Sequence, residues 1–289
     1  MKVVTVATDL ENPFLSRLLI PSCRVADLEL TVLHVQARRK FRFADKRACL
    51  TRYLSQVADR DELIFFTDAY DTLFIQGERY IQHAYAGFPQ PVVFSAELNC
   101  WPLGVVGLAL CPGTPIGRYP YLNSGGIVGP AGDLLDLCTK YPEPPSGRFD
   151  LLERLRSHGY DTDQLFGSSD QYYWTLVQHL EPDRVGLDSD AQIFEYFGPS
   201  MPGLSKAEIM REVQEFREQG RRAASYRRDR ARLKAQLTTP SSAAQLHFAS
   251  KMTKAALLDL WEEGEVPDWL RDRTEQASAA APGFRVYRV

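Results

Sequence analysis

The sequence predicts an α/β protein with a mainly parallel central sheet flanked by helices. Three observations support this fold class. Short apolar runs alternate with segments whose apolar residues recur at helical spacing. The run LIFFT at 63–67 is continuously apolar, as expected for a strand covered on both faces. The chain has 289 residues, of which 44% are hydrophobic, so it can bury the core that such a sheet needs.

The expected elements follow one another along the chain in alternation. We expect strands where a short apolar run contains Val, Leu, Ile or Phe, namely at 2–7, 30–35, 63–67, 92–97, 125–129 and 192–194. We expect helices where apolar residues fall three or four apart, namely at 46–58, 133–141 and 170–180. Because ligands gather at the carboxyl ends of parallel strands, polar residues that follow these strands are the candidate site.

The chain is expected to form one domain over 1–262 and a C-terminal tail over 263–289. Within the domain, 206–234 is polar, and its end at 221–234 carries seven basic residues and one acidic residue. Two interpretations remain open. The segment is either a solvated helix or mobile insertion, or a basic surface for an anionic acceptor or partner.

Composition limits the classes of partner and compartment. The formal net charge of −3 favours neither nucleic acid nor a membrane as a general partner. The sequence shows no signal-peptide pattern and no apolar run of membrane-spanning length. Its five cysteines are scattered without a CxxC pair, which argues against a disulfide framework or zinc site and predicts a reducing, cytoplasmic location.

Two aspartates directly after the apolar strand carry the main chemical signal. Asp68 and Asp71 form a D-x-x-D pair at the end of FTDAYD. Aspartates also cap helices and turn loops, so the spacing alone is a weak signal. Carboxylates at the mouth of a buried strand nevertheless suit Mg²⁺ or Mn²⁺, because burying them without a counter-charge is costly. Such a cation commonly stabilises a departing diphosphate.

Several further motifs occur in a fixed order around this pair. They are FSAELNCWP at 94–102, YLNSGGIVG at 121–129, SSDQYYW at 168–174, LDSDAQIF at 187–194 and LHFASKMTK at 246–254. Together with FTDAYD, they resemble the glycosyltransferase domain of the procollagen lysyl hydroxylases and related collagen glycosyltransferases, over about residues 2–260. The resemblance implies a GT-A-type glycosyltransferase fold, a nucleotide-sugar donor that is usually UDP-linked, and Mn²⁺.

The resemblance also implies a set of metal ligands. Asp68 and Asp71 match the metal-binding aspartates of the family, and His247 of LHFASK matches its third protein ligand. An imidazole nitrogen beside two carboxylates suits Mn²⁺ better than Mg²⁺. The family usually continues this histidine with Asn-Gly, whereas here 248–250 reads FAS. Lys251 or Lys254 is the candidate for the family's diphosphate-binding lysine.

The remaining matches assign residues to the donor and the acceptor. Asp170 matches an acidic segment of the family and is the candidate catalytic carboxylate, although it also precedes a helix as a cap residue would. The string DTDQLF at 161–166 is an alternative match. Candidate donor-binding or catalytic residues are Thr8, Lys46, Asn123, Ser124, Gly125 and Gly126, and candidate substrate-binding residues are Glu97, Asn99, Trp101, Asp188 and Gln192. We expect the two glycines to let the backbone approach a sugar or adopt unusual dihedrals.

These matches predict an enzyme that transfers glucose or galactose from UDP-glucose or UDP-galactose to an acceptor hydroxyl. The acceptor would be hydroxylysine-like, or belong to another peptide, a glycan or a small molecule. Two alternatives stay open: a nucleotide-sugar-binding protein on a degenerate GT-A fold, and a glycosyltransferase for hydroxylated nucleic acid bases. Neither the choice of hexose, the anomeric outcome nor the oligomeric state follows from the sequence.

Overall fold

A seven-stranded sheet forms the centre of the computed structural model, which describes residues 1–36, 41–57, 59–110, 117–143, 150–201, 203–275 and 283–288. The strand order is β10-β2-β1-β3-β6-β5-β7. All pairs in this sheet are parallel except those that β6 makes with β3 and β5. The strands are β1 (Lys2–Ala7), β2 (Leu30–His34), β3 (Leu63–Asp68), β5 (Val92–Glu97), β6 (Tyr121–Pro130), β7 (Val185–Asp188) and β10 (Phe284–Arg288).

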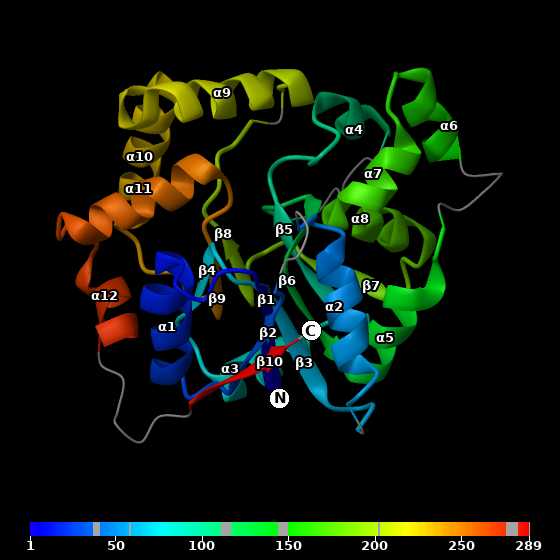
Figure 1. The fold of residues 1–289 in the computed structure, drawn as a ribbon, viewed down its shortest axis with the longest axis horizontal. Helices are drawn as coiled ribbons and strands as arrows, with labels where there is room; N and C mark the ends of the chain where they lie inside the picture. The colour runs from blue at the N-terminus through cyan, green and yellow to red at the C-terminus, as the bar shows by residue number, and fades with distance from the viewer. Residues whose placement is uncertain are drawn as a thin grey trace.

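Both faces of the sheet are covered, which explains its continuously apolar strands. Side chains alternate between the faces, so Ile64 and Phe66 of β3 join one core while Phe65 joins the other. The first core is closed by α2 (Asp45–Leu54), α5 (Ala131–Lys140), α6 (Asp150–Ser157), α7 (Thr162–Ser168) and α8 (Asp170–Leu180), which Figure 1 shows on one side of the sheet. The second core is closed by η1 (Leu15–Leu19), α1 (Ile20–Val25) and α3 (Glu78–Tyr85). The short α4 (Val105–Leu110) follows β5 along the chain.

A smaller sheet, in the order β4-β9-β8, stands beside the carboxyl end of β3. Its strands are β4 (Thr72–Phe74), β8 (Phe194–Tyr196) and β9 (Gln245–His247). Its core contains Leu73, Leu246 and Phe248, and the helical C-terminal part packs against it. Those helices are α9 (Lys206–Gln219), η2 (Gly220–Arg222), α10 (Ala224–Gln236), α11 (Lys251–Glu262) and α12 (Asp268–Glu275), with α9 to α11 at the upper left of Figure 1.

The expected α/β class with a mainly parallel central sheet is confirmed. The strands at 2–7 and 92–97 and the helix at 170–180 have the expected bounds. The helix expected at 46–58 is α2, which ends at Leu54, and Ala58 lies outside the described residues. The strand expected at 192–194 instead covers Phe194–Tyr196, because Asp188 accepts backbone hydrogen bonds from Gln192 and Ile193 in the preceding turn.

Two further segments differ from their expected form. The strand expected at 125–129 is the antiparallel β6, which begins at Tyr121 and so brings Asn123 and Ser124 into the sheet. The tail after residue 262 contains α12 and the edge strand β10, which pairs with β2. In the described part of the chain, no helix has both the length and the apolar character needed to cross a membrane. Cys23, Cys49, Cys100 and Cys138 form no disulfide within the described residues, and Cys111 lies outside them.

Candidate active site

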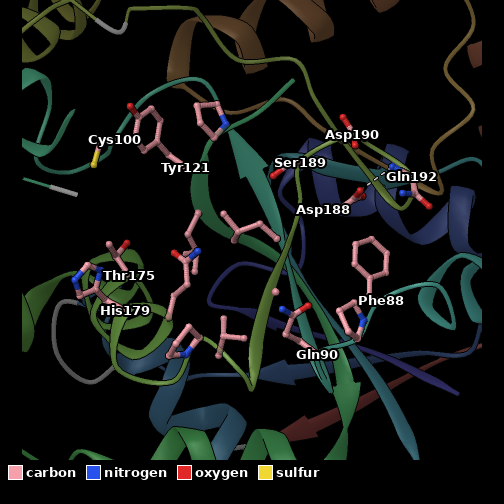
Figure 2. Close-up of a pocket in the computed structure, with 18 of the residues that line it drawn as sticks. Phe88, Gln90, Cys100, Tyr121, Thr175, His179, Asp188, Ser189, Asp190 and Gln192 are labelled. Carbon is pink, nitrogen blue, oxygen red and sulfur yellow. Dashed lines mark hydrogen bonds between the residues drawn. The ribbon is translucent and has the colours of Figure 1, made fainter. Parts of the chain in front are cut away.

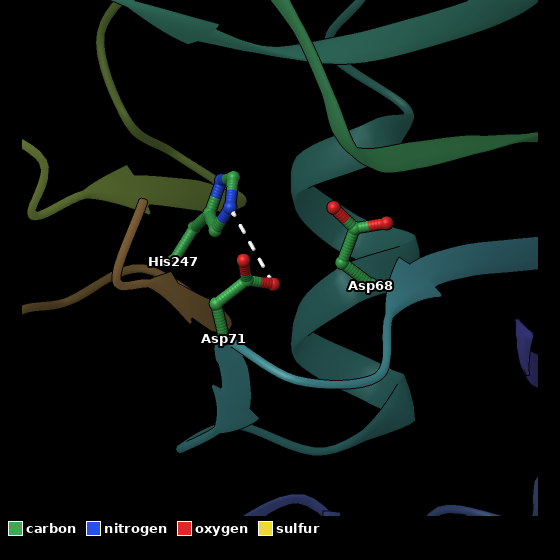
Figure 3. A group of neighbouring side chains, drawn as sticks. All are labelled: Asp68, Asp71 and His247. Atoms are coloured by element: carbon green, nitrogen blue, oxygen red, sulfur yellow. Dashed lines mark ion pairs between the residues drawn. The ribbon is translucent and has the colours of Figure 1, made fainter. Parts of the chain in front are cut away.

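Three side chains from different elements meet at the carboxyl end of β3. Asp68 ends β3, Asp71 lies in the turn before β4, and His247 ends β9. One ligand atom from each lies within 4.8 Å of the others, and Figure 3 shows the three side chains turned toward a shared space. The antiparallel pairing of Thr72 with His247 and the hydrogen bond from the Phe248 N–H to the Asp71 carbonyl hold the two segments together. The three residues predicted as ligands are therefore neighbours in the fold.

Asp71 lies between two nitrogen groups. Its Oδ1 is 3.8 Å from His247 Nε2, and its Oδ2 is 3.2 Å from the Lys254 ammonium. Burial alone raises the pKa of Asp71, but Lys254 and His247 outweigh it and hold this pKa well below its usual range. The carboxylate is therefore ionised and available as a ligand. Its buried Oδ1 accepts no hydrogen bond from the described residues.

Asp68 and Asp170 share one buried cation. The Lys46 ammonium, in the first turn of α2, is 2.6 Å from Asp68 Oδ1 and 3.6 Å from Asp170 Oδ2. Burial alone lowers the pKa of Lys46, but the two carboxylates outweigh it and raise this pKa. Burial raises the pKa of Asp170 although Lys46 opposes it. Both Asp170 oxygens are buried without a hydrogen bond to the described residues, so this carboxylate has unused acceptor capacity.

The donor set fits a divalent cation. Two carboxylates and one imidazole offer hard oxygen and intermediate nitrogen ligands, a combination suited to Mn²⁺. The Oδ1 of Asp71 faces His247 Nε2 at 3.8 Å and accepts no hydrogen bond from the described residues. A buried anionic oxygen without a hydrogen-bond donor is costly, and a bound cation would compensate it. Asp68, Asp71 and His247 are the residues that would hold the ion.

Tyr70, between the two aspartates, links this turn to the end of β1. Its hydroxyl oxygen accepts hydrogen bonds from the N–H groups of Thr8 and Asp9, each at 2.7 Å. Thr8 is thereby placed beside the D-x-x-D turn, and its role in donor binding stays a prediction. Sequence reasoning missed Tyr70, because a tyrosine between two aspartates carries no signal of its own.

A second cluster of buried polar groups surrounds Glu97 at the end of β5. Its Oε1 accepts hydrogen bonds from Asn123 Nδ2 at 2.9 Å and Gln171 Nε2 at 2.7 Å, and its Oε2 accepts a longer one from Asn99. Burial raises the pKa of Glu97 despite these donors. Asn99 also donates to the hydroxyl of Tyr196. Gln171 was not predicted, since a glutamine within an aromatic helix gave no sign of its partners.

Gly125 and Gly126 meet protein side chains at close range. Neither has a positive φ, so the expectation of unusual dihedrals is wrong. A β-carbon on Gly125 would lie 2.3 Å from His247 Cε1, and one on Gly126 would lie 2.5 Å from Phe194 Cδ1. The side chains of His247 and Phe194 therefore lie against these two glycines, and the approach of a sugar to this motif stays a prediction.

A pocket of about 900 Å³ lies apart from the three ligands, between β7, α8 and the segments that flank β5 and β6. Trp101, Asp188 and Gln192 are among its lining residues, and Figure 2 shows the last two on one wall. Asp188 is fully buried and accepts three backbone hydrogen bonds, from Gln192, Ile193 and Phe194. Its carboxylate therefore shapes the turn that forms this wall.

The two candidate diphosphate lysines lie in different environments. Lys254 contacts Asp71 at the candidate metal site, whereas Lys251 is exposed at the start of α11. Of the two lysines, Lys254 is therefore the better candidate for the family's diphosphate-binding lysine. Phe248, which stands where the family usually has Asn, is buried and stacks on Phe197 at 5.1 Å. Phe248 thus belongs to the core beside β9, and the three candidate ligands lie together although this residue is not Asn.

The basic segment 221–234 begins in η2 and continues through most of α10, and five of its seven basic side chains pair with acidic residues. Arg221 of η2 pairs with Asp259 of α11, and Arg228 of α10 pairs with Glu212 of α9. Arg230 and Lys234 pair with Glu263 and Glu265 just after α11, and Arg232 pairs with Asp229 within α10 and donates to the Phe197 carbonyl. These contacts connect η2 and α10 with α9, with α11 and with the residues that follow α11.

Comparison with known proteins gives distant matches over about half of the chain. Procollagen-lysine,2-oxoglutarate 5-dioxygenase 1 of Mus musculus is 30% identical over 152 residues, which cover 50% of this chain and 18% of that protein. Uncharacterized protein R699 of Acanthamoeba polyphaga mimivirus is 28% identical over 145 residues, which cover 47% of this chain and 25% of that protein. The chain thus spans about a fifth to a quarter of these relatives' length.

Solved structures with a similar arrangement include two glycosyltransferases. One is involved in the glycosylation of the major capsid of PBCV-1, with a TM-score of 0.44 and 11% identity over 89% of this chain and 98% of that one. The other is mouse xyloside xylosyltransferase 1, with a TM-score of 0.44 and 12% identity over 85% of this chain and 96% of that one.

The family model described as the PLOD GT domain matches residues 1–145, which make up half of the chain. This region contains β1, the D-x-x-D turn, Glu97 and the YLNSGG motif. The architecture is the α/β class that the resemblance implied, with only β6 antiparallel in the central sheet. The chain belongs to the PLOD glycosyltransferase-domain family.

Proposed function

We propose that this protein is a Mn²⁺-dependent glycosyltransferase that moves glucose or galactose from a UDP-sugar to an acceptor hydroxyl. The single observation that carries the proposal is the convergence of Asp68, Asp71 and His247, where the buried Asp71 Oδ1 accepts no hydrogen bond from the described residues. Lysine ammonium groups flank this cluster on both sides, at Lys46 and Lys254. The two aspartates suit a metal cation, and the two lysines suit the negative charge of a diphosphate bound to that cation.

The chemistry divides among the residues of the site. When bound, the cation would neutralise charge on the departing diphosphate. Lys254 and Lys46 would add fixed positive charge on either side of the leaving group. The bond between the anomeric carbon and the diphosphate oxygen breaks, and a bond forms from that carbon to the acceptor oxygen. The hydroxyl proton needs an acceptor, and Asp170, with its raised pKa and a carboxylate that forms an ion pair with Lys46 at 3.6 Å but no hydrogen bond with the described residues, suits that role.

Donor and acceptor are assigned to different parts of the site. We assign Thr8, Ser124 and Lys46 to donor binding, and Tyr70 fixes the end of β1 beside Thr8. We assign the hydrogen-bonded cluster of Glu97, Asn99 and Asn123 to sugar or acceptor hydroxyl groups. We propose a hydroxylysine-like side chain as acceptor, because the relatives named procollagen-lysine dioxygenase share this domain.

Calorimetry with UDP, with and without Mn²⁺, tests the metal and donor assignments. We expect UDP binding to require Mn²⁺ and to be lost in Asp71→Ala. If Asp71→Ala binds Mn²⁺ and UDP as the wild type does, the metal assignment is wrong. UDP release from a panel of UDP-sugars, with and without free hydroxylysine or a hydroxylysine peptide, then identifies the hexose and the acceptor. Good UDP binding without release from any sugar would favour the degenerate-binder alternative.

A further inference from the structure

His247 lacks the contact that ordinarily orients a metal-binding histidine. Such a histidine usually donates its second ring N–H to a carboxylate, a carbonyl or water, which fixes the direction of the first nitrogen. Here Nε2 faces Asp71, while Nδ1 is buried without a hydrogen-bond partner among the described residues. The main chain of His247 is fixed through β9, but main-chain contacts leave the rotation of the ring free. Something else must hold the ring.

Gly125 of β6 closes one side of the imidazole. A β-carbon at this position would lie 2.3 Å from Cε1 and 2.8 Å from each ring nitrogen of His247. The backbone of Gly125 cannot easily withdraw, because its N–H donates to Asn123 Oδ1 at 2.7 Å and its carbonyl accepts from Gln245 Nε2 at 3.3 Å. The ring of Tyr196 approaches the imidazole edge-on, with centroids 6.4 Å apart.

We infer that Gly125 is a positioning residue for the metal site, which sets the orientation of the His247 ring by packing in place of a hydrogen bond. The inference rests on the proposed metal site and goes beyond it. Gly125 has an extended backbone without positive φ, so alanine is compatible with its dihedrals. A methyl group at position 125 would therefore clash with the imidazole ring of His247 and not with the backbone. To relieve this clash, the ring must rotate so that Nε2 no longer faces Asp71.

The neighbouring glycine offers a matched control. A β-carbon on Gly126 would meet Phe194 Cδ1 at 2.5 Å and Gln245 Oε1 at 2.6 Å, with His247 absent from its nearest contacts. Gly126→Ala thus imposes a similar steric conflict in the same strand, directed at a different partner. If the two glycines served only the packing of the strand, Gly125→Ala and Gly126→Ala would change Mn²⁺ affinity equally.

The experiment measures Mn²⁺ affinity directly, by the loss of the free-ion electron paramagnetic resonance signal, without donor, acceptor or turnover. The proteins are the wild type, Gly125→Ala, Gly126→Ala, His247→Ala and the double variant Gly125→Ala/His247→Ala. We expect Gly125→Ala to weaken Mn²⁺ binding by about 10- to 100-fold, the range found when the group that orients a metal ligand is lost. Gly126→Ala should stay within about twofold of the wild type.

The double variant shows whether Gly125 acts through His247. If it does, Gly125→Ala should change Mn²⁺ affinity less than about twofold when His247 is already Ala, because the effects of coupled residues are not additive. Thermal unfolding in EDTA supplies a readout free of metal. There, Gly125→Ala should lower the melting temperature, and His247→Ala should relieve most of that loss by removing the ring.

Each outcome decides the inference separately from the proposed function. A wild type that does not bind Mn²⁺ overturns the metal site itself. A wild type that binds, with Gly125→Ala equally tight, or with equal losses in both His247 backgrounds, overturns the role of Gly125 alone. Should Gly125→Ala fail to fold, recovery of folding in the double variant supports the inference. Failure of both to fold refutes it, since the cost would then lie in the backbone.

Discussion

Lys46→Met is expected to change metal binding and UDP binding in opposite directions. The Lys46 ammonium lies 2.6 Å from Asp68 Oδ1, an atom that would face the cation, and the side chain of Lys46 is only 10% exposed. In the protein without metal, this ammonium compensates Asp68 and Asp170. A cation and the ammonium then compete for Asp68. With UDP present, the same ammonium would add charge toward the diphosphate.

The size of the effect follows from charge and distance. Two unit charges about 4 Å apart interact by about 4 kcal/mol at an effective dielectric constant of about 20, and a divalent ion increases this further. The 24% exposure of the Asp68 side chain screens part of the interaction. We therefore expect a net gain of about 1.4 to 2.8 kcal/mol, which is roughly 10- to 100-fold tighter Mn²⁺ binding. UDP binding at saturating Mn²⁺ should weaken by about tenfold or more, because a charge-assisted contact is lost.

Two titrations measure the two effects. Free Mn²⁺ followed by electron paramagnetic resonance gives the metal affinity, and calorimetry gives the UDP affinity at saturating Mn²⁺. Lys251→Met is the control, since it removes an exposed lysine and should match the wild type in both titrations. Weaker Mn²⁺ binding in Lys46→Met would refute the reasoning, because the ammonium would then support the metal site. Unchanged values in both titrations would refute it as well.

Three other perturbations test separate parts of the structure. Gln171→Leu should destabilise the fold by roughly 1–3 kcal/mol in chemical denaturation, because Glu97 and two backbone carbonyls lose a buried donor. Mn²⁺ affinity should stay unchanged, and a large change in it would contradict the separation of the two clusters. The segment 221–234 should give no salt-sensitive binding to duplex DNA by fluorescence anisotropy, and a steep loss of affinity between 50 and 200 mM salt would show that its charges are available. Hydrogen bonds from Arg221 lower the pKa of Asp259 against burial, so its contribution to stability is present above the unfolded pKa and lost as pH falls through the folded value. Asp259→Asn should lower the melting temperature at pH 7 and flatten its fall below about pH 4, whereas a parallel pH profile would contradict this assignment.

Local sequence patterns predicted five of the seven strands of the central sheet and the helices α2, α5 and α8. The strands at 2–7 and 92–97 are buried along almost their whole length, as their short apolar runs predict. The direction of β6 was not predictable, because apolar spacing does not encode whether a strand runs parallel to its neighbours. Its third residue, Asn123, is polar and buried, because its side chain donates to Glu97 and accepts from the Gly125 N–H.

The site residues were only partly predictable, and the reason differs from the one that applies to the strands. Asp71 and His247 are far apart in sequence, and only the order of motifs placed them together. Gln171 and Tyr70 escaped notice because their importance lies in partners from other elements, which no local pattern reveals. The charge of 221–234 was read correctly as basic, but its partners on α9 and α11 appear only once the helices are packed.

β6 pairs with its two neighbours in different registers. Against β3 the pairing is regular from Leu63 with Pro130 to Thr67 with Gly126. Against β5 it shifts between Phe94, which faces Ile127, and Ser95, which faces Asn123. Residues 124–126 form a bulge there, and bulges commonly re-aim side chains beside active sites.

The bulge lies between the two halves of the site, and one residue connects them. The cluster around Glu97 lies on the β5 side of the shift, while His247 and the two aspartates lie on the β3 side. Asn123 joins the two halves, because its side chain donates to Glu97 and accepts from the Gly125 N–H. Engineered variants of this protein should therefore tolerate exchanges at 98–101 that keep Glu97 far better than any insertion or deletion within 124–126.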